Sequence, residues 1–310
     1  MSHLFGPVPS RRLGRSLGVD LIPRKTCSFN CIYCEVGPTT HLTVKRRAHA
    51  VPEIIGELEE YCRRSPGDLD YVTLAGSGEP TLNLGLGEII AAIKALTAVP
   101  VAVLTNGSLL YLPEVRRELA RADVILPSLD AGREETFRRL NRPHPRLTLE
   151  LVVRGIKALR REFQGEVWLE VMLLQGINDS EEELEALKGL IADIAPHRIQ
   201  LNTLVRPGAD PEARPVEPEE LERIARWFGP TCEVIAGGSR KAAAAGGVVD
   251  RELLEMLARR PMTAGDLARA LGVEGSQVET RLVNLAEQGL VEMNLHQDRK
   301  FYRALPTAPG

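Results

Sequence analysis

The alternation of apolar runs with amphipathic segments over residues 17–240 constrains the fold more than any other feature. Short runs rich in Val, Ile and Leu are typical of strands buried on both faces, and they occur at "LGVDLI" (17–22), "DYVTLA" (70–75), "VPVAVLT" (99–105), "DVILPSL" (123–129), "VWLEVMLL" (167–174) and "RIQLNTL" (198–204). Between them lie helical patterns such as "SEEELEALKGLIADI" (180–194), which opens with a capping-box pair, Ser180 and Glu183. This order predicts an α/β fold with a parallel sheet. Six such units fall short of the eight of a complete barrel, so we expect a partial (β/α)6 barrel of TIM type.

The composition changes after residue 236. The stretch "AGGSRKAAAAGGVVD" (236–250) is rich in Gly and Ala, which is typical of a linker. Three helical patterns and the pattern of a two-stranded ribbon follow, and together they resemble a small winged helix-turn-helix. We therefore expect three parts, namely a core at 1–240, a linker at 241–249 and a winged-helix-like domain at 250–310.

Three of the five cysteines, Cys27, Cys31 and Cys34, lie within the single stretch "KTCSFNCIYCEVG". A structural zinc site uses four ligands, and a thioredoxin-like pair would need only two of these thiols. Three thiolates on a [4Fe–4S] cluster leave one iron open to a small-molecule ligand. The other two, Cys62 and Cys232, form no second pair, and we expect both to be buried free thiols.

The cysteine spacing resembles the signature of the radical S-adenosylmethionine (SAM) superfamily, C-x3-C-x-aromatic-C, with Tyr33 as the aromatic residue. Over residues 10–240 the other family motifs follow in order at the ends of predicted strands, namely "GSGEP" (76–80), "LTNG" (104–107) and "PSLDA" (127–131). The leader "FGPVPSRRLGRSLGVDLIPRKTCSFNCIYCEVG" resembles the wyosine-synthase-like branch of that superfamily. The chain lacks the further cysteines that the second cluster of true wyosine synthases would need.

The resemblance implies the cofactors and the chemistry. A [4Fe–4S] cluster on Cys27, Cys31 and Cys34 would reduce SAM and cleave it to methionine and a 5′-deoxyadenosyl radical, which would abstract hydrogen from a substrate. A ferredoxin or flavodoxin would supply the electron.

The resemblance and the strand ends together give candidate SAM-binding residues: Gly78, Glu79, Asn106, Ser128, Asp130, Glu170 and Asn202. Glu79 could accept from the SAM ammonium group while Gly78 lets the backbone approach closely. The structural alternatives are that Asn106 belongs to an Asn-Gly turn, and that Asp130 or Asp179 caps a following helix.

Charge is distributed unevenly. Residues 1–50 hold eight Arg or Lys and two acidic residues, a net +6, whereas the whole chain carries −3. We therefore expect an anionic substrate near the cluster, a nucleotide, an RNA base or a phosphorylated metabolite, contacted by Arg11, Arg12 and Arg15. The alternative is that these side chains are solvated or paired with acids elsewhere.

The C-terminal region carries a net charge of −1 over residues 250–310. Winged helices often read DNA with the third helix, but the third helical pattern offers only Arg281, and the wing only Arg299, Lys300 and Arg303. These four residues do not form the continuous basic surface that follows a nucleic-acid backbone. For this region we therefore favour protein contact or substrate presentation over DNA binding. A second hypothesis is an iron–sulfur redox-sensing regulator that binds DNA. The SAM motifs favour the enzyme, because a sensor needs no SAM pocket.

No apolar run approaches the roughly 20 residues that span a bilayer. The start, "MSHLFGPVPSRR", lacks the apolar core of a secretory signal, and clustered thiols suit a reducing compartment. We expect a cytoplasmic protein without a membrane partner.

Overall fold

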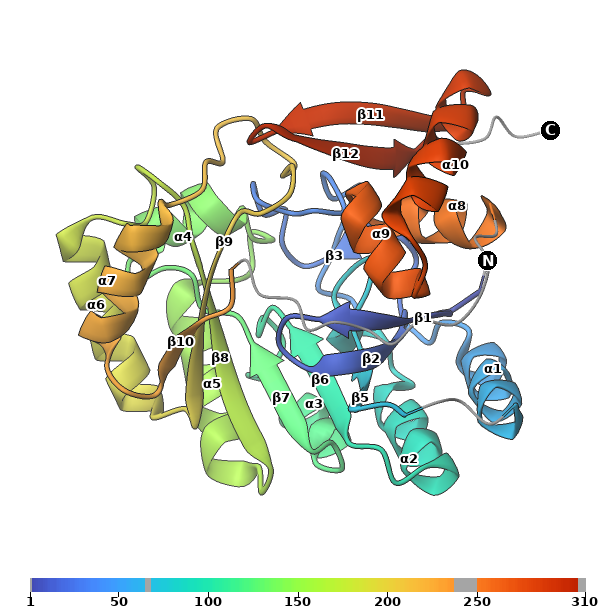
Figure 1. Cartoon of the computed structure of the whole chain (residues 1–310). Coiled ribbons are helices and arrows are strands. Elements are labelled where there is room, and N and C mark those ends of the chain that lie inside the picture. The colour runs from blue at the N-terminus through green and yellow to red at the C-terminus, as the bar shows by residue number, and fades with distance from the viewer. Residues whose placement is uncertain (1, 65–67, 237–249, 306–310) are drawn as a thin grey trace.

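The computed structural model of the chain describes residues 2–64, 68–236 and 250–305 (Figure 1). The linker expected at 241–249 lies outside these ranges, and the division of the chain at 240 and 250 stays a prediction.

One eight-stranded sheet forms the centre of the protein, in the order β1-β2-β5-β6-β7-β8-β9-β10. The β1 strand is antiparallel to β2, and the remaining neighbours pair in parallel. All six predicted strands are present within the sheet, whose members are β1 (Leu4–Ser10), β2 (Gly14–Val19), β5 (Tyr71–Leu74), β6 (Val101–Thr105), β7 (Val124–Pro127), β8 (Glu166–Leu173), β9 (Arg198–Thr203) and β10 (Cys232–Val234). Over the described residues no pairing joins β1 to β10, so the α/β sheet is open, as a partial barrel requires.

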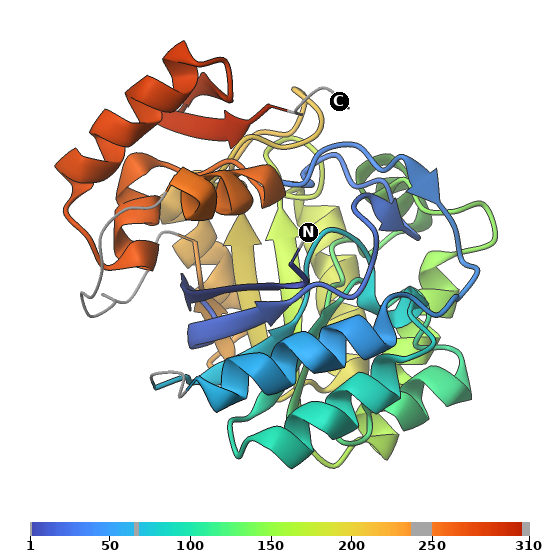
Figure 2. The same cartoon turned by 90° about the vertical axis from the view of Figure 1, so that its right-hand side faces the viewer.

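Helices follow the parallel strands and pack around the outside of the sheet, as Figures 1 and 2 show. They are α1 (Val51–Arg63), the short 3₁₀ helix η1 (Pro80–Leu82), α2 (Leu86–Leu96), α3 (Pro113–Leu119), α4 (Glu134–Asn141), α5 (Leu149–Glu162), α6 (Glu181–Ile194) and α7 (Pro218–Phe228). Because the connections alternate in this way, the carboxyl ends of the strands meet at one edge of the sheet.

The β1 strand was not expected, and the first predicted strand begins at Gly14 instead of residue 17. The segment does not resemble a typical strand sequence because it contains Gly6, Pro7 and Pro9. Proline lacks an N–H and is confined to edge strands. The structure places β1 at that edge.

The capping box expected at α6 is half formed. Ser180 Oγ accepts from the backbone N–H of Glu183 at 3.3 Å. The carboxylate of Glu183 does not return to Ser180, because it accepts from the Gly132 N–H (2.5 Å), Arg133 Nε (2.8 Å) and Thr136 Oγ1 (2.8 Å). The reciprocal half of the prediction is wrong, since this buried carboxylate instead ties α6 to the start of α4.

The C-terminal region confirms the predicted helix-turn-helix and wing. It consists of α8 (Asp250–Arg259), α9 (Ala264–Leu271), α10 (Gly275–Glu287), β11 (Val291–His296) and β12 (Arg299–Ala304). These elements have their own apolar core, which includes Leu257, Leu267 and Leu282. In both views this C-terminal domain, coloured orange to red, lies over the β1–β2 hairpin and the carboxyl edge of the sheet.

Candidate functional site

The three clustered cysteines lie on the loop that follows β2. This loop contains two short paired strands, β3 (Thr26–Cys27) and β4 (His41–Leu42). Its backbone is fixed by hydrogen bonds from the Lys25 N–H to the Ser77 oxygen (2.7 Å) and from the Cys34 N–H to the Cys31 oxygen (3.2 Å). Cys27, Cys31 and Cys34 are free thiols. Burial raises the pKa of each, that of Cys27 to about 12.

The three thiols supply the donor chemistry of an iron–sulfur cluster. Among the described residues, no three His, Cys, Asp or Glu side chains converge closely enough to hold one ion. A cubane places its thiolates on separate irons, so its ligands enclose a larger volume. Two amide side chains also donate toward the sulfurs, Asn106 to Cys27 and Asn141 to Cys31, each at 3.5 Å. Hydrogen bonds to sulfur are a normal part of cluster sites.

Asp130 holds the aromatic residue of the cysteine signature. Its carboxylate accepts from the Tyr33 hydroxyl (2.5 Å), the Asn141 amide (2.8 Å) and the Met172 N–H (2.9 Å). Burial raises the pKa of Asp130 even though these hydrogen bonds favour the ionised form. The alternative that Asp130 caps a helix is wrong, because the N-cap of α4 is Arg133.

Glu79 ties the "GSGEP" loop to the end of β6. The side chain is 2% exposed. It accepts from the Thr81 N–H (3.0 Å), Thr81 Oγ1 (2.6 Å), Thr105 Oγ1 (2.6 Å) and the Asn106 N–H (2.7 Å). Burial raises the pKa of Glu79 despite these donors. Next to it, a Cβ atom added to Gly78 would lie 2.0 Å from the Thr26 oxygen, so only glycine allows this approach to the cysteine loop.

Glu170 and Asn202 face the turn of the β1–β2 hairpin. Arg12 forms an ion pair with Glu170. Arg11 Nη1 donates to Asn202 Oδ1 (3.4 Å), and Asn202 Nδ2 donates to Glu170 Oε1 (3.1 Å). Ser128, at the end of β7, forms a β-bridge with Glu170. Two predicted substrate-binding arginines and three predicted SAM-binding residues thus belong to one neighbourhood.

The remaining basic residues of the leader behave differently. Arg15 is exposed, and its backbone N–H donates to Asp70 (2.7 Å). It does not line the cavity that contains Arg11 and Arg12. Arg46 forms an ion pair with Glu118, so the alternative expectation of pairing with distant acids is confirmed there.

A cavity of about 350 Å³ lies between the hairpin, the cysteine loop and the C-terminal domain. It reaches Glu35 and Val36, which directly follow Cys34, and Gly76 and Ser77 of the "GSGEP" motif. Its lining includes seven arginines, Arg11, Arg12, Arg206, Arg259, Arg260, Arg269 and Arg299. Glu35 and Asp266 are the acidic residues of the lining.

Five of those arginines were not expected in a site. No local pattern marks Arg206, Arg259, Arg260, Arg269 or Arg299, because tertiary packing alone brings them to Arg11 and Arg12. The one available signal was the surplus of positive charge in residues 1–50, which predicted an anion but not the second wall of its site.

The cavity is strongly electropositive. Burial and the neighbouring Arg11 lower the pKa of Arg12 to about 9, and burial and Arg206 lower that of Arg260 to about 10. Although burial opposes it, Arg206 and Arg260 lower the pKa of Glu35 to about 2. All of these groups are therefore charged at neutral pH.

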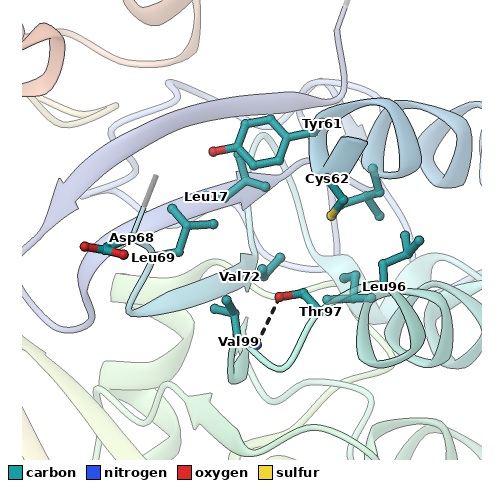
Figure 3. A pocket seen from close by; sticks show the side chains of 11 residues that line it. Leu17, Tyr61, Cys62, Asp68, Leu69, Val72, Leu96, Thr97 and Val99 are labelled. Carbon is teal, nitrogen blue, oxygen red and sulfur yellow. Dashed lines mark hydrogen bonds between the residues drawn. The ribbon is translucent and has the colours of Figure 1, made fainter. Parts of the chain in front are cut away.

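A second cavity, of about 270 Å³, lies at the opposite, amino edge of the sheet, between the ends of α1 and α2 (Figure 3). Its lining is mainly apolar, with Leu17, Val72 and Leu96 around the Cys62 thiol. Cys62 and Cys232 are free, as expected, but both are partly exposed instead of fully buried. Burial raises the pKa of both thiols.

In the described parts of the chain, every helix is too short or too polar to cross a bilayer.

Comparisons with known proteins identify two families in the chain. The family described as "Radical SAM superfamily" matches residues 21–187, more than half of the chain, and "Helix-turn-helix domain" matches residues 249–294. A protein from Brachyspira hyodysenteriae named "GTPase Obg" is 40% identical over 294 residues, which are 93% of this chain but 43% of that protein. A "UPF0026 protein" of Helicobacter pylori (strain J99) is 34% identical over 266 residues, 84% of this chain and 85% of the relative.

Solved structures agree on the fold. SuiB of Streptococcus suis, crystallised with S-adenosylmethionine, has a TM-score of 0.54 at 13% identity, covering 71% of this chain and 50% of SuiB. The three-cysteine loop, the ordered strand-end motifs and these matches lead to one conclusion: the chain belongs to the radical SAM superfamily, whose members use a [4Fe–4S] cluster and SAM, and within it to the UPF0026 family.

Proposed function

We propose that this radical SAM enzyme acts on a small anionic substrate bound in the arginine-lined cavity. The observation that carries the proposal is the position of that cavity, which is bounded both by the residues after Cys34 and by the "GSGEP" motif. A substrate held there by guanidinium groups would lie beside both cofactor-binding motifs.

In this proposal, different parts of the chain bind the cofactors and position the substrate. Cys27, Cys31 and Cys34 would hold the cluster, and the absence of a fourth cysteine from this loop leaves room for SAM at the open iron. When bound, the cluster and SAM supply the radical chemistry that removes hydrogen from a substrate. The protein positions the substrate through charge and restricts water with the C-terminal domain over the cavity.

The SAM contacts of Gly78, Glu79, Asn106, Ser128, Asp130, Glu170 and Asn202 stay predictions. Glu79 and Asp130 already accept several hydrogen bonds from the protein, so their first role in our proposal is to fix the loops that surround SAM. The wyosine-synthase-like branch, the ferredoxin or flavodoxin donor and the cytoplasmic location also stay predictions.

The alternative, a DNA-binding iron–sulfur regulator, is not favoured. Its third helix, α10, offers Arg281 as its one basic side chain, and Glu279 and Glu287 are exposed on the same helix. A helix of this charge provides little attraction for phosphates.

The proposal is tested by the variant Cys31→Ala. After anaerobic reconstitution, wild-type protein given dithionite and SAM should release 5′-deoxyadenosine, whereas Cys31→Ala should lose the cluster absorbance, the bound iron and the product. Cys62→Ala is the matched control, because Cys62 lies in the distant apolar cavity, and it should keep all three. A wild-type protein with a full cluster that releases no 5′-deoxyadenosine would contradict the proposal, and so would a Cys31→Ala variant as active as the wild type.

A further inference from the structure

The C-terminal domain forms one wall of the arginine-lined cavity. Arg259 and Arg260 come from the end of α8, Arg269 from α9 and Arg299 from β12. The opposite wall contains Arg11, Arg12 and Arg206. Arg11 and Arg12 precede the arginines of the C-terminal domain by more than 200 residues, yet all of these guanidinium groups face one space.

One of these arginines attaches the domain to the core. Arg259 Nη2 donates to the Ser2 oxygen (2.9 Å) and the Leu4 oxygen (3.3 Å), and its guanidinium carbon lies 4.4 Å from the centre of the Phe5 ring. At the other end of the domain, Gln297 Nε2 donates to the Leu204 oxygen (3.3 Å). The domain is thus fastened on both sides of the cavity.

Other arginines keep unused donors. Within the described residues, the Arg260 side chain makes no hydrogen bond or ion pair. Arg206 is buried, 9% exposed, and pairs with Glu35 at 3.0 Å, yet its Nε atom has no acceptor. The buried Nε of Arg12 also lacks one. Buried donors without acceptors destabilise a protein, so the Nε atoms of Arg12 and Arg206 need an acceptor that the described side chains do not supply, either water or a ligand oxygen.

Charge and geometry indicate the class of that acceptor. Seven arginines line the cavity, and four of them pair with carboxylates: Arg206 with Glu35, Arg269 with Asp266, Arg12 with Glu170 and Arg259 with Asp20. A surplus of three positive charges remains, which a single carboxylate would not neutralise. A phosphate or diphosphate carries more charge, and its oxygens match the planar forks of several guanidinium groups. A volume of about 350 Å³ lies within the range of small-molecule sites.

The arginines of the cavity lining are not positioned to contact DNA. Arg259, Arg260 and Arg269 line the internal cavity, while exposed Arg281 on α10 lies 3.7 Å from Asp250. A winged helix that reads DNA would carry its basic groups on the outer face of the third helix.

We propose that α8, α9 and the wing of the C-terminal domain are the phosphate-recognition wall of the substrate cavity, so that this helix-turn-helix domain binds a phosphate-bearing substrate in place of DNA. The inference rests on the proposed function only where it calls the ligand a substrate. Anion binding itself requires neither the cluster nor SAM.

The test is calorimetric titration of the full chain with inorganic pyrophosphate, at an ionic strength held constant with chloride. Wild-type protein should bind pyrophosphate, and Arg260→Gln should raise the Kd at least tenfold, which corresponds to about 1.4 kcal/mol. Arg281→Gln makes the same change of charge within the same domain but outside the cavity, and it should keep the wild-type Kd. Should Arg260→Gln fail to fold, Arg299→Gln replaces it, with an expected loss of about threefold or more.

Three results would overturn the inference. The first is that pyrophosphate binds the wild type no more tightly than chloride does. The second is an equal rise of the pyrophosphate Kd in Arg260→Gln and Arg281→Gln. The third is salt-sensitive binding of duplex DNA that Arg281→Gln weakens. Release of 5′-deoxyadenosine by the wild type is assayed separately. Its failure would count against the proposed function and leave the pyrophosphate result unaffected.

Discussion

Gly78 lies where the loop after β5 passes next to the strand that carries Cys27. The Glu79 N–H donates to the Thr26 oxygen at 3.2 Å, so the two cofactor loops are joined through their backbones. A side chain at position 78 would separate them.

We therefore predict that Gly78→Ala destabilises the protein. The added Cβ would meet the Thr26 oxygen at 2.0 Å, and overpacking of this kind lowers the free energy of unfolding by about 1–3 kcal/mol. Gly56→Ala is the control, because position 56 lies inside α1 with nothing within 4 Å of the added atom. It should raise the free energy of unfolding by about 0.5–1 kcal/mol. Urea denaturation measures both, and equal stabilities for the two variants would count against the close approach.

The site residues show what a sequence can and cannot disclose. The cysteine site was predictable, because the spacing of Cys27, Cys31 and Cys34 within one short segment already indicates its chemistry. The partner of Asp130 was not, since Tyr33 and Met172 reach it only through tertiary packing. Polar residues at strand ends indicate a shared edge, but they do not say which contact ligand and which contact each other.

At the scale of elements, α9 begins with a complete capping box. Thr263 Oγ1 accepts from the Asp266 N–H (3.1 Å), and the Asp266 carboxylate accepts from the Thr263 N–H (3.4 Å). Asp266 also forms an ion pair with Arg269. Although burial opposes it, Arg206, the Thr263 hydroxyl and Arg269 lower the pKa of Asp266.

This arrangement predicts a pH-dependent loss in Asp266→Asn. A folded-state pKa below the unfolded value of about 3.9 means that the ionised carboxylate stabilises the fold above that pH. The stabilisation is lost as the pH falls through the folded-state pKa. At pH 7 the variant should lower the free energy of unfolding by about 1 kcal/mol. The difference in free energy of unfolding between the variant and the wild type should shrink between about pH 4 and pH 3, below the unfolded-state pKa. Urea denaturation across this range checks the trend. Asp298→Asn, in the exposed turn of the wing and outside any capping box, is the control and should change the free energy of unfolding little at pH 7.

Strands differed from helices in how well the sequence indicated them. The six core strands are apolar runs, and each was located within a few residues of its true position. The β1 strand escaped notice because its prolines contradict the usual strand pattern, and β10 because it is only 3 residues long. The capping pair at α6 was half right, since a competing set of donors near α4 captured Glu183.

At the scale of the whole molecule, Arg259 is one of the side chains that join the C-terminal domain to β1. Its two hydrogen bonds to backbone oxygens and its contact with the Phe5 ring join the last helices of the chain to its first strand. The net charge of the domain, −1, did not indicate this arrangement, because a sum of charges does not record which face of the domain the charged residues occupy.

Arg259→Ala should loosen this attachment. Charge-assisted hydrogen bonds contribute about 1.5–3 kcal/mol, so amide exchange in β1 and α8 should become faster by about tenfold or more. Hydrogen–deuterium exchange followed by mass spectrometry measures the effect. Arg281→Ala, on the exposed face of α10, should leave the exchange of β1 unchanged. Unaltered exchange of β1 in Arg259→Ala would mean that other contacts hold the domain.

The order of the elements along the chain has a consequence for biogenesis. The cysteine loop is translated more than 200 residues before α8, which at ribosomal speeds is an interval of roughly 10–40 seconds. Throughout that interval the wall of the cavity that the C-terminal domain provides has not been synthesised. The cysteine loop is therefore uncovered by the C-terminal domain for a period during synthesis, before the last helices dock onto the first strand.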